Sequence, residues 1–262
     1  MEEVVDRVIE AVVSNAPHIE SGLKHRREYA GKNNPSDEEV MEADLWANEI
    51  FKEEITAIEG VGEYASEEEE EVTNCGDGLS VAIDPLDGSS NIPTNNLIGT
   101  IVGIYDSELP ASGEHLVASF YVLYGPLKTL VVARDDSVNE YVIEGAPGEE
   151  TELHLASEDI EIEEANVYGF GGNKGWFDDF REMEDEMSRE LKLRYGGSLV
   201  GDFNQMLHHG GVFGYPEKEG YPDGKYRILF EGNPMAFIAE TAGGASSNGH
   251  KSVREVDIGN IH

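Results

Sequence analysis

The sequence contains few basic side chains and almost no cysteine. It has 18 Lys and Arg residues against 54 Asp and Glu residues over 262 positions, a formal net charge of -36. A surface with this charge repels phosphate backbones, so the composition excludes a nucleic-acid-binding function. The single cysteine, Cys75, excludes an internal disulfide framework.

Long apolar runs are also absent from the sequence. No run is long enough to cross a bilayer, and the acidic start Met1-Glu2-Glu3-Val4 differs from a signal peptide. We therefore expect a cytoplasmic protein with no membrane partner. The length allows a sizeable core and two lobes, and periodic apolar patterns continue almost from end to end, which disfavours disorder.

The excess of acid is typical of a protein that works in very concentrated salt. At molar ionic strength the Debye length is about 3 Å, so the repulsion between surface carboxylates is largely screened. We therefore predict a halophilic protein that loses stability in dilute buffer.

The stretch that carries most chemical information is Asp84–Asn91, with the sequence DPLDGSSN. The apolar run Leu79–Ile83 before it predicts a buried strand. Asp84 and Asp87 provide carboxylate oxygens, the ligands that Mg²⁺ and Mn²⁺ prefer. The small residues Gly88–Ser90 predict a turn whose amides bind a phosphate. A pair of acids three residues apart often occurs by chance in so acidic a chain. The apolar strand before this pair and the small-residue turn after it distinguish it from a chance pair.

Two helices are expected before this stretch. Apolar residues at helical spacing predict a first helix over 2–16, ended by Pro17, after which a second pattern runs to about Leu23. A capping-box pattern at 36–39 predicts a second helix over about 37–57, with Asp44 beside its apolar face.

The acid run Glu67–Glu71 lies between the second helix and the central strand. Such a run is usually a solvated loop. Because one short connection separates it from the strand before Asp84, its first members could turn into the same site.

The rest of the chain predicts an antiparallel sheet followed by an α/β lobe. Runs of β-branched and aromatic residues predict strands at 98–105, 116–124, 129–134 and 140–143. The second half alternates strands at 166–170, 211–215 and 225–230 with helices at 178–191 and 197–208 and a helix capped by Asn233. The polar segment 157–165 separates the two predicted lobes, 1–158 and 159–262. His208-His209 lacks partners at ligand spacing, so we expect a structural role for it.

Basic and tyrosine side chains that could bind a phosphate are scarce. Lys225 and Arg227 alternate along one predicted strand and share a face, just before Glu231. Arg194-Tyr195 precedes a Gly-Gly turn, and Tyr215 ends a predicted strand. Each of these alone is as often an ordinary surface residue. Two bases on one strand face beside an acid are unusual in a chain of this charge.

Taken together, these patterns resemble the metal-dependent, lithium-sensitive phosphatases, a superfamily that includes inositol monophosphatases and fructose-1,6-bisphosphatases. The Asp84–Asn91 stretch is similar to the central motif of the superfamily. The segment Phe230–Phe237 (FEGNPMAF), followed by Ala242-Gly243-Gly244, is similar to the signature of class I fructose-1,6-bisphosphatases. The resemblance implies the layered α/β fold of the sugar phosphatases, with an N-terminal α+β lobe, a C-terminal α/β lobe and the site between them.

The resemblance also implies a role for individual residues. It implies two or three Mg²⁺ or Mn²⁺ ions, held by the carboxylates of Glu67, Glu68, Asp84, Asp87 and Glu231 and the carbonyl of Leu86. Asp44 and Glu68 would activate the attacking water. The implied substrate-binding residues are Gly88, Ser89, Ser90 and Arg227 at the 1-phosphate, Tyr195, Tyr215 and Lys225 at the 6-phosphate, Asn173, and Arg194, which in this family reaches into a neighbouring subunit. A homo-oligomer, either a dimer or a tetramer, is therefore expected.

The reaction implied is the metal-dependent hydrolysis of fructose 1,6-bisphosphate to fructose 6-phosphate and phosphate, a step of gluconeogenesis. Two alternatives stay open at this point. An inositol or broad-specificity sugar monophosphatase on the same scaffold would not need the second anion site that Lys225, Tyr215 and Arg194 suggest. A non-catalytic metal-binding regulatory protein would bind metal loosely and release no phosphate.

Two positions depart from the pattern that family members use to bind the inhibitor AMP. Gly78-Leu79 and Asp106 stand where basic or aromatic ligands would be expected, and the N-terminus is short. We therefore predict that AMP does not inhibit the protein.

Overall fold

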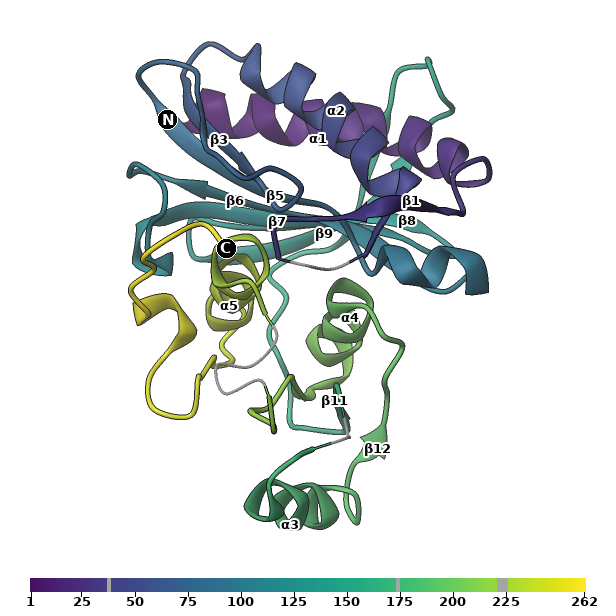
Figure 1. Cartoon of the computed structure of the whole chain (residues 1–262), viewed down its shortest axis with the longest axis vertical. Helices are drawn as coiled ribbons and strands as arrows, with labels where there is room; N and C mark the ends of the chain where they lie inside the picture. Colours follow the sequence, from purple (N-terminus) through teal and green to yellow (C-terminus); the bar gives the residue numbers. More distant parts are fainter. Residues whose placement is uncertain (37–38, 173–174, 221–225) are drawn as a thin grey trace.

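An eight-stranded sheet forms the centre of the computed structural model, which describes residues 1–36, 39–172, 175–220 and 226–262. The strand order is β10-β9-β8-β7-β6-β5-β3-β4 (Figure 1). The strands are β3 (Val61–Ser66), β4 (Thr73–Asn74), β5 (Leu79–Asp87), β6 (Ile98–Tyr105), β7 (Leu116–Tyr124), β8 (Lys128–Arg134), β9 (Ser137–Glu144) and β10 (Glu152–Ser157).

The pairing of these strands confirms the predicted antiparallel sheet. From β5 to β10 each strand pairs antiparallel with the next. The predicted strands 98–105 and 116–124 coincide with β6 and β7, whereas β10 and the parallel pairing of β3 with β5 were not predicted.

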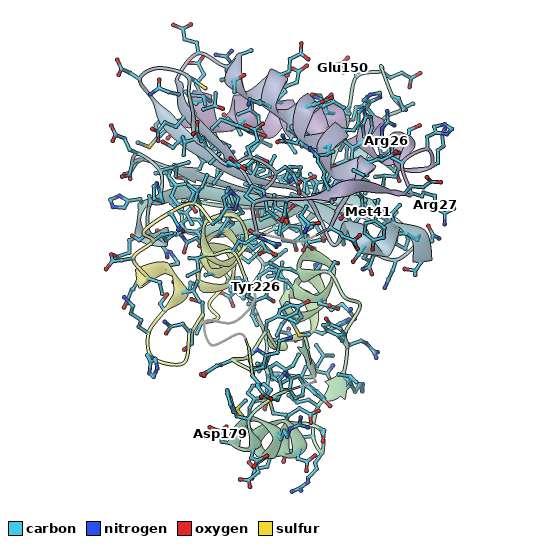
Figure 2. All side chains as sticks on the ribbon, in the orientation of Figure 1. Arg26, Arg27, Met41, Glu150, Asp179 and Tyr226 are labelled. Carbon is cyan, nitrogen blue, oxygen red and sulfur yellow. The ribbon has the colours of Figure 1, made fainter. Side chains whose placement is uncertain are left out.

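Helices α1 (Glu2–Leu23) and α2 (Glu42–Thr56) cover one face of the sheet (Figure 1). Their apolar faces and the side chains of that sheet face form the largest buried cluster, which includes Val12, Phe51 and Phe120. Arg26 and Arg27 lie just after the C-terminal end of α1 (Figure 2). No helix in the described ranges is long and apolar enough to cross a bilayer.

The prediction that the first helix ends at Pro17 is wrong, because α1 continues to Leu23. A proline inside a helix costs about 3 kcal/mol. However, Pro17 and Ile19 are buried and continue the apolar face of the helix. Burying a side chain such as Ile19 contributes about 1.5–3 kcal/mol, which offsets much of that cost.

The predicted start of the second helix near residue 37 is also wrong. Strand β2 (Glu39–Met41) pairs antiparallel with β1 (Tyr29–Asn33), so α2 begins only at Glu42. The Met41 amide donates a 2.8 Å hydrogen bond to the carboxylate of Asp44, which caps the helix in place of the predicted box. Asp37 and Glu38 of that box lie outside the described residues.

The other face of the sheet packs against α4 (Leu199–His209) and α5 (Asn233–Thr241). Beyond these helices lies a small parallel sheet of order β12-β11-β13, with β11 (Val167–Phe170), β12 (Lys192–Leu193) and β13 (Gly211–Gly214). Helix α3 (Asp178–Met187) lies farthest from the central sheet (Figures 1 and 2). Short turns of 3₁₀ helix occur at Ser89–Thr94, Gly113–His115 and Val253–Glu255. The predicted alternation of strands and helices in this half is confirmed, apart from the segment described next. The prediction that Asn233 caps the last helix is wrong: Asn233 is the first residue of α5, and its side-chain amide donates to the carbonyl of Ala111 and not to an amide of the helix.

The predicted strand 225–230 is wrong over its described part. Ile228–Gly232 forms a π-helical turn, in which the amides of Glu231 and Gly232 both donate to the carbonyl of Arg227. Neighbouring side chains on a strand point to opposite faces. Leu229 and Phe230 are both buried in one apolar cluster, which a helical turn permits. Lys225 lies outside the described residues.

His208 on α4 makes a contact of 3.4 Å with the carboxylate of Glu140 on β9. Glu140 is buried, so the pair joins the helix to the sheet. This contact agrees with the structural role expected for His208.

Candidate active site

The central motif lies at the end of β5, a strand whose residues are all buried. The carboxylate of Asp84 accepts a 3.0 Å hydrogen bond from the amide of Leu86, which fixes the turn around Pro85. Gly88 follows with a φ of 74°, and a Cβ at this position would lie 2.2 Å from the Cβ of Ser198. Glycine is therefore required here for both conformation and space.

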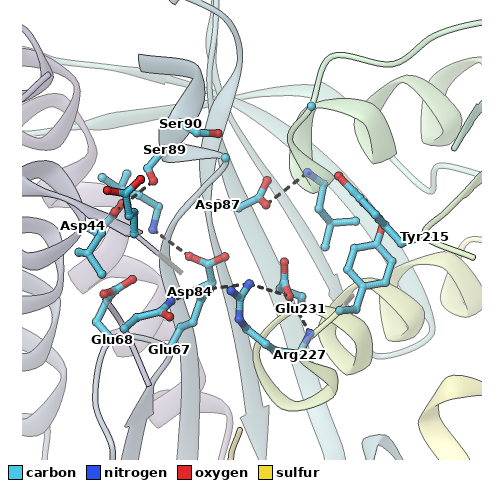
Figure 3. A pocket seen from close by; sticks show the side chains of 18 residues that line it. Asp44, Glu67, Glu68, Asp84, Asp87, Ser89, Ser90, Tyr215, Arg227 and Glu231 are labelled. Carbon is cyan, nitrogen blue, oxygen red and sulfur yellow. Dashed lines mark hydrogen bonds and ion pairs between the residues drawn. The ribbon is translucent and has the colours of Figure 1, made fainter. Parts of the chain in front are cut away.

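A pocket collects most of the predicted site residues from three parts of the chain. Figure 3 shows Asp44, Glu67 and Glu68 on one side, Tyr215, Arg227 and Glu231 on the other, and the motif between them. The lining also includes Asp84, Leu86, Asp87, Gly88, Ser89 and Ser90. The predicted convergence of these distant segments is therefore present in the structure.

Three buried carboxylates in this pocket form a set that fits a divalent cation. Asp84, Asp87 and Glu231 can each offer an oxygen within 4.8 Å of the others. Burial raises the pKa of Asp87 to about 7, and the neighbouring Glu231 adds to the shift. Burial and then the charge of Glu67 raise the pKa of Asp84. Because the ionised forms are unfavourable without a counterion, and because hard cations prefer oxygen ligands, the residues fit Mg²⁺ or Mn²⁺.

Arg227 lies between two of the pocket's acids. Its guanidinium is 3.2 Å from Glu67 and 3.5 Å from Glu231. Its amide also donates a 2.8 Å hydrogen bond to the carboxylate of Glu231. Glu67 accepts a further hydrogen bond of 3.2 Å from the side chain of Asn34. Arg227 therefore balances part of the negative charge and helps to orient both acids.

Asp44 and Glu68 each keep one buried oxygen without a hydrogen-bond partner among the described residues. The other oxygen of Asp44 accepts a 3.0 Å hydrogen bond from the hydroxyl of Ser89. Burial, followed by the charges of Asp44 and Glu67, raises the pKa of Glu68 to about 8, and burial raises that of Asp44 to about 6. An unsatisfied buried oxygen costs about 1–3 kcal/mol. Both atoms are therefore well suited to bind a water molecule or a ligand.

A tyrosine cluster forms the opposite wall of the pocket. The hydroxyls of Tyr195 and Tyr215 are 3.1 Å apart, and the rings of Tyr215 and Tyr226 meet edge to face with centroids 4.8 Å apart. Tyr195 is 45% exposed and, within the described parts of the chain, is not among the residues that line the pocket; it is linked to the pocket through Tyr215. Arg194 is exposed and does not line the pocket of its own chain, as far as the described residues show. Asn173 and Lys225 lie outside the described residues.

Six residues that line the pocket were not predicted as site residues: Asn34, Glu39, Val40, Gly197, Leu199 and Tyr226. Tyr226 had a usable signal, because it lies directly between the two predicted phosphate ligands Lys225 and Arg227. Asn34 belongs to a turn sequence, and only its contact with the distant Glu67 reveals its place in the site. Such contacts across the chain leave no local pattern in the sequence.

A layered α/β fold with clustered carboxylates beside a small-residue phosphate loop is typical of metal-dependent phosphoric monoester hydrolases. Two family models match the chain: one described as the N-terminal domain of fructose-1,6-bisphosphatase over residues 7–154, and one described as its C-terminal domain over residues 162–262. The chain therefore belongs to the fructose-1,6-bisphosphatase family.

Individual relatives agree with this assignment. The chain is 46% identical to the class 1 fructose-1,6-bisphosphatase of Natronomonas pharaonis, with 100% of this chain and 93% of the relative covered. It is 46% identical to that of Halobacterium salinarum, with 100% and 91% covered. A crystal structure of Leishmania major fructose-1,6-bisphosphatase in holo form superposes with a TM-score of 0.89 at 27% identity, covering 99% of this chain and 87% of that one. The two archaeal relatives come from halophiles, in line with the acidic composition.

Proposed function

We propose that the protein hydrolyses the 1-phosphate of fructose 1,6-bisphosphate and releases fructose 6-phosphate and phosphate, as in gluconeogenesis. The observation that carries this proposal is the position of Asp44 and Glu68. Their unpartnered oxygens line the same pocket as the Asp84, Asp87 and Glu231 cluster. The pair of Asp44 and Glu68 can thus hold a water molecule beside the position where cations and a phosphate would bind.

The carboxylates of Glu67, Glu68, Asp84, Asp87 and Glu231 and the carbonyl of Leu86 would hold two or three Mg²⁺ or Mn²⁺ ions. When bound, such ions neutralise phosphoryl oxygens and lower the pKa of water. Without them the neighbouring acids would repel an anionic substrate. Removing a ligand should therefore reduce turnover and not only substrate affinity.

Asp44 and Glu68 would handle the proton of the attacking water. Burial raises the pKa of both groups, to about 6 for Asp44 and about 8 for Glu68, so Glu68 takes up a proton more readily than Asp44. The carboxylate of Asp44 is oriented by Ser89 and by the Met41 amide, so its free oxygen is held ready to accept a hydrogen bond from water. A held acceptor of this kind favours in-line attack because the water is positioned before the reaction.

The substrate's two phosphates would bind at opposite ends of the pocket. Gly88, Ser89 and Ser90 offer amides and hydroxyls for the 1-phosphate, and Arg227, which lines the same pocket, would supply a positive charge. Tyr195 and Tyr215, joined through their hydroxyls, would contact the 6-phosphate together with Lys225. We assign a substrate contact to Asn173 as well, on the family resemblance alone.

Arg194 would complete the site of a neighbouring subunit, because it is exposed and is not among the described residues that line the pocket of its own chain. A dimer or tetramer follows from this role, and its mass in solution tests it. The division into lobes at residues 158 and 159 and a cytoplasmic location remain part of the same proposal.

The direct test is the release of phosphate in molar KCl, with and without Mg²⁺, from fructose 1,6-bisphosphate and from inositol 1-phosphate. We expect Mg²⁺-dependent release from the bisphosphate and a much slower reaction with the monophosphate. Equal rates on both substrates would instead assign a broad monophosphatase, and no release from either would leave a metal-binding protein without catalysis.

A further inference from the structure

The third acid of the Glu67–Glu71 run is anchored on both its side chain and its backbone. Helix α2 holds the side chain: Asn48 donates to one carboxylate oxygen of Glu69 at 3.0 Å, and Lys52 donates to the other at 2.6 Å. The hydroxyl of Tyr64 donates to the side-chain oxygen of Asn48, which leaves the amide nitrogen of Asn48 facing Glu69. Both carboxylate oxygens of Glu69 are therefore held, one by Asn48 and the other by Lys52.

The backbone of Glu69 is held from the opposite direction. Its carbonyl accepts a 2.7 Å hydrogen bond from Nε2 of His262. The other ring nitrogen of His262, Nδ1, is 3.3 Å from the hydroxyl of Ser36. The same ring packs against Phe230, the neighbour of Glu231, with centroids 5.4 Å apart.

Glu67 and Glu68, which precede this anchor, point into the active-site pocket. The amide of Glu67 is tied to the Ile83 carbonyl of β5, and the amide of Glu68 to the hydroxyl of Ser66. The short loop is thus fixed before and after the two acids. A shift of Glu69 would be passed directly to them because only one peptide bond separates Glu68 from it.

We propose that Glu69 is a positioning residue that sets the direction of Glu67 and Glu68 for cation binding. The inference rests on the proposed function, because it assigns those two acids to the metal site. Neighbouring groups that orient metal ligands typically contribute ten- to a hundredfold in metal affinity.

The contact with Lys52 argues for positioning and against a role in overall stability. The Lys52 side chain is 38% exposed, and a partly exposed ion pair of this kind contributes little to stability. Losing Glu69 should therefore leave the folded structure largely intact, while the side chains of Glu67 and Glu68 lose their orientation. Glu70 and Glu71, the next acids of the run, are exposed. They provide matched controls with the same change in charge.

The test is calorimetric titration of Mg²⁺ into metal-free Glu69→Ala, Glu70→Ala and wild-type protein in molar KCl. We expect Glu69→Ala to bind Mg²⁺ about ten- to a hundredfold more weakly, and Glu70→Ala to match wild type. Glu69→Gln should recover most of the affinity, since its side-chain oxygen can still accept from Asn48. At saturating Mg²⁺ the KM for substrate should be unchanged in Glu69→Ala.

Equal Mg²⁺ affinity of Glu69→Ala and Glu70→Ala would overturn the proposal, as would failure of Glu69→Gln to recover. If Glu69→Ala does not fold, Lys52→Met is measured instead. It removes one of the two side-chain contacts to the Glu69 carboxylate and must lower the Mg²⁺ affinity by a smaller factor. Calorimetry needs no turnover, so this result is independent of whether wild type hydrolyses fructose 1,6-bisphosphate.

Discussion

The carboxylate of Asp87 accepts a 2.7 Å hydrogen bond from the amide of Val200 at the start of α4. The same carboxylate belongs to the buried cluster of Asp84, Asp87 and Glu231. One side chain of the central motif is thus both a cap for a helix of the second half and a proposed cation ligand. Helix α4 and the proposed metal site both use the Asp87 carboxylate. Different substitutions at Asp87 should therefore affect the two roles separately.

Replacing Asp87 by Asn should remove cation binding while keeping one of the two hydrogen bonds to the start of α4. The Asp87 carboxylate accepts from the amides of Leu199 and Val200, and the single amide oxygen of asparagine can accept from one of them. The metal-free melting temperature of Asp87→Asn should therefore fall less than that of Asp87→Ala, and added Mg²⁺ should no longer raise it. Asp87→Ala should lose both roles and destabilise the metal-free protein by about 1 kcal/mol. Thermal unfolding with and without Mg²⁺ measures both effects. A normal Mg²⁺-induced rise in Asp87→Asn would contradict the assignment of Asp87 as a ligand.

The His208–Glu140 contact should make stability depend on pH. Glu140 raises the pKa of His208 above its ordinary value of 6.5. The protonated histidine is favoured in the folded state, so the contribution is fully present below pH 6.5 and is lost as the pH rises through the raised pKa. His208→Gln should therefore lose stability relative to wild type at low pH and approach it at high pH. Urea unfolding at several pH values checks this, and a constant difference across that range would exclude the ion pair.

Much of the fold could be predicted because the sequence patterns that indicate its strands and helices are local. The predicted runs 98–105 and 116–124 coincide with β6 and β7, because continuous runs of β-branched and aromatic residues bounded by turns favour a strand over other structures. Pro17 misled the prediction because a local rule says that proline ends a helix. The burial that carries α1 past it depends on a sheet formed by later residues.

The candidate site likewise contains some residues that local sequence patterns identify and others that only the folded structure reveals. Asp84 and Asp87 could be found from the motif around them, and Glu231 from the family signature. The capping role of Asp44 and the contact between Asn34 and Glu67 could not, because each depends on backbone that pairs or packs only in the folded chain. The turn at Ile228–Gly232 likewise places Glu231 by burying two neighbouring residues together, which an alternating pattern cannot indicate.

The net charge of -36 should make the folded state depend on salt. The repulsion between carboxylates reaches farther in dilute buffer, where the Debye length grows from about 3 Å to about 30 Å. The melting temperature should therefore fall markedly when molar KCl is replaced by dilute buffer without divalent ions. An unchanged melting temperature would show that the acidic surface is not an adaptation to salt.

AMP should leave the rate of phosphate release unchanged at millimolar concentration. Asp106 stands where the family resemblance leads us to expect a basic or aromatic AMP ligand, and its carboxylate is 3.1 Å from the ring of His115. Its negative charge would repel the phosphate of AMP. Inhibition assays in molar KCl test this, and clear inhibition below millimolar AMP would show that another AMP site exists.

The central claim is that the acids at the end of β5 perform metal-dependent phosphate release, and Asp84→Ala tests it most directly. The comparison is the kcat for phosphate release from fructose 1,6-bisphosphate in molar KCl at saturating Mg²⁺, for wild type and for variant protein shown to be folded. Our account predicts Mg²⁺-dependent turnover by wild type and a collapse of kcat in Asp84→Ala. Turnover of the variant close to that of wild type would contradict it.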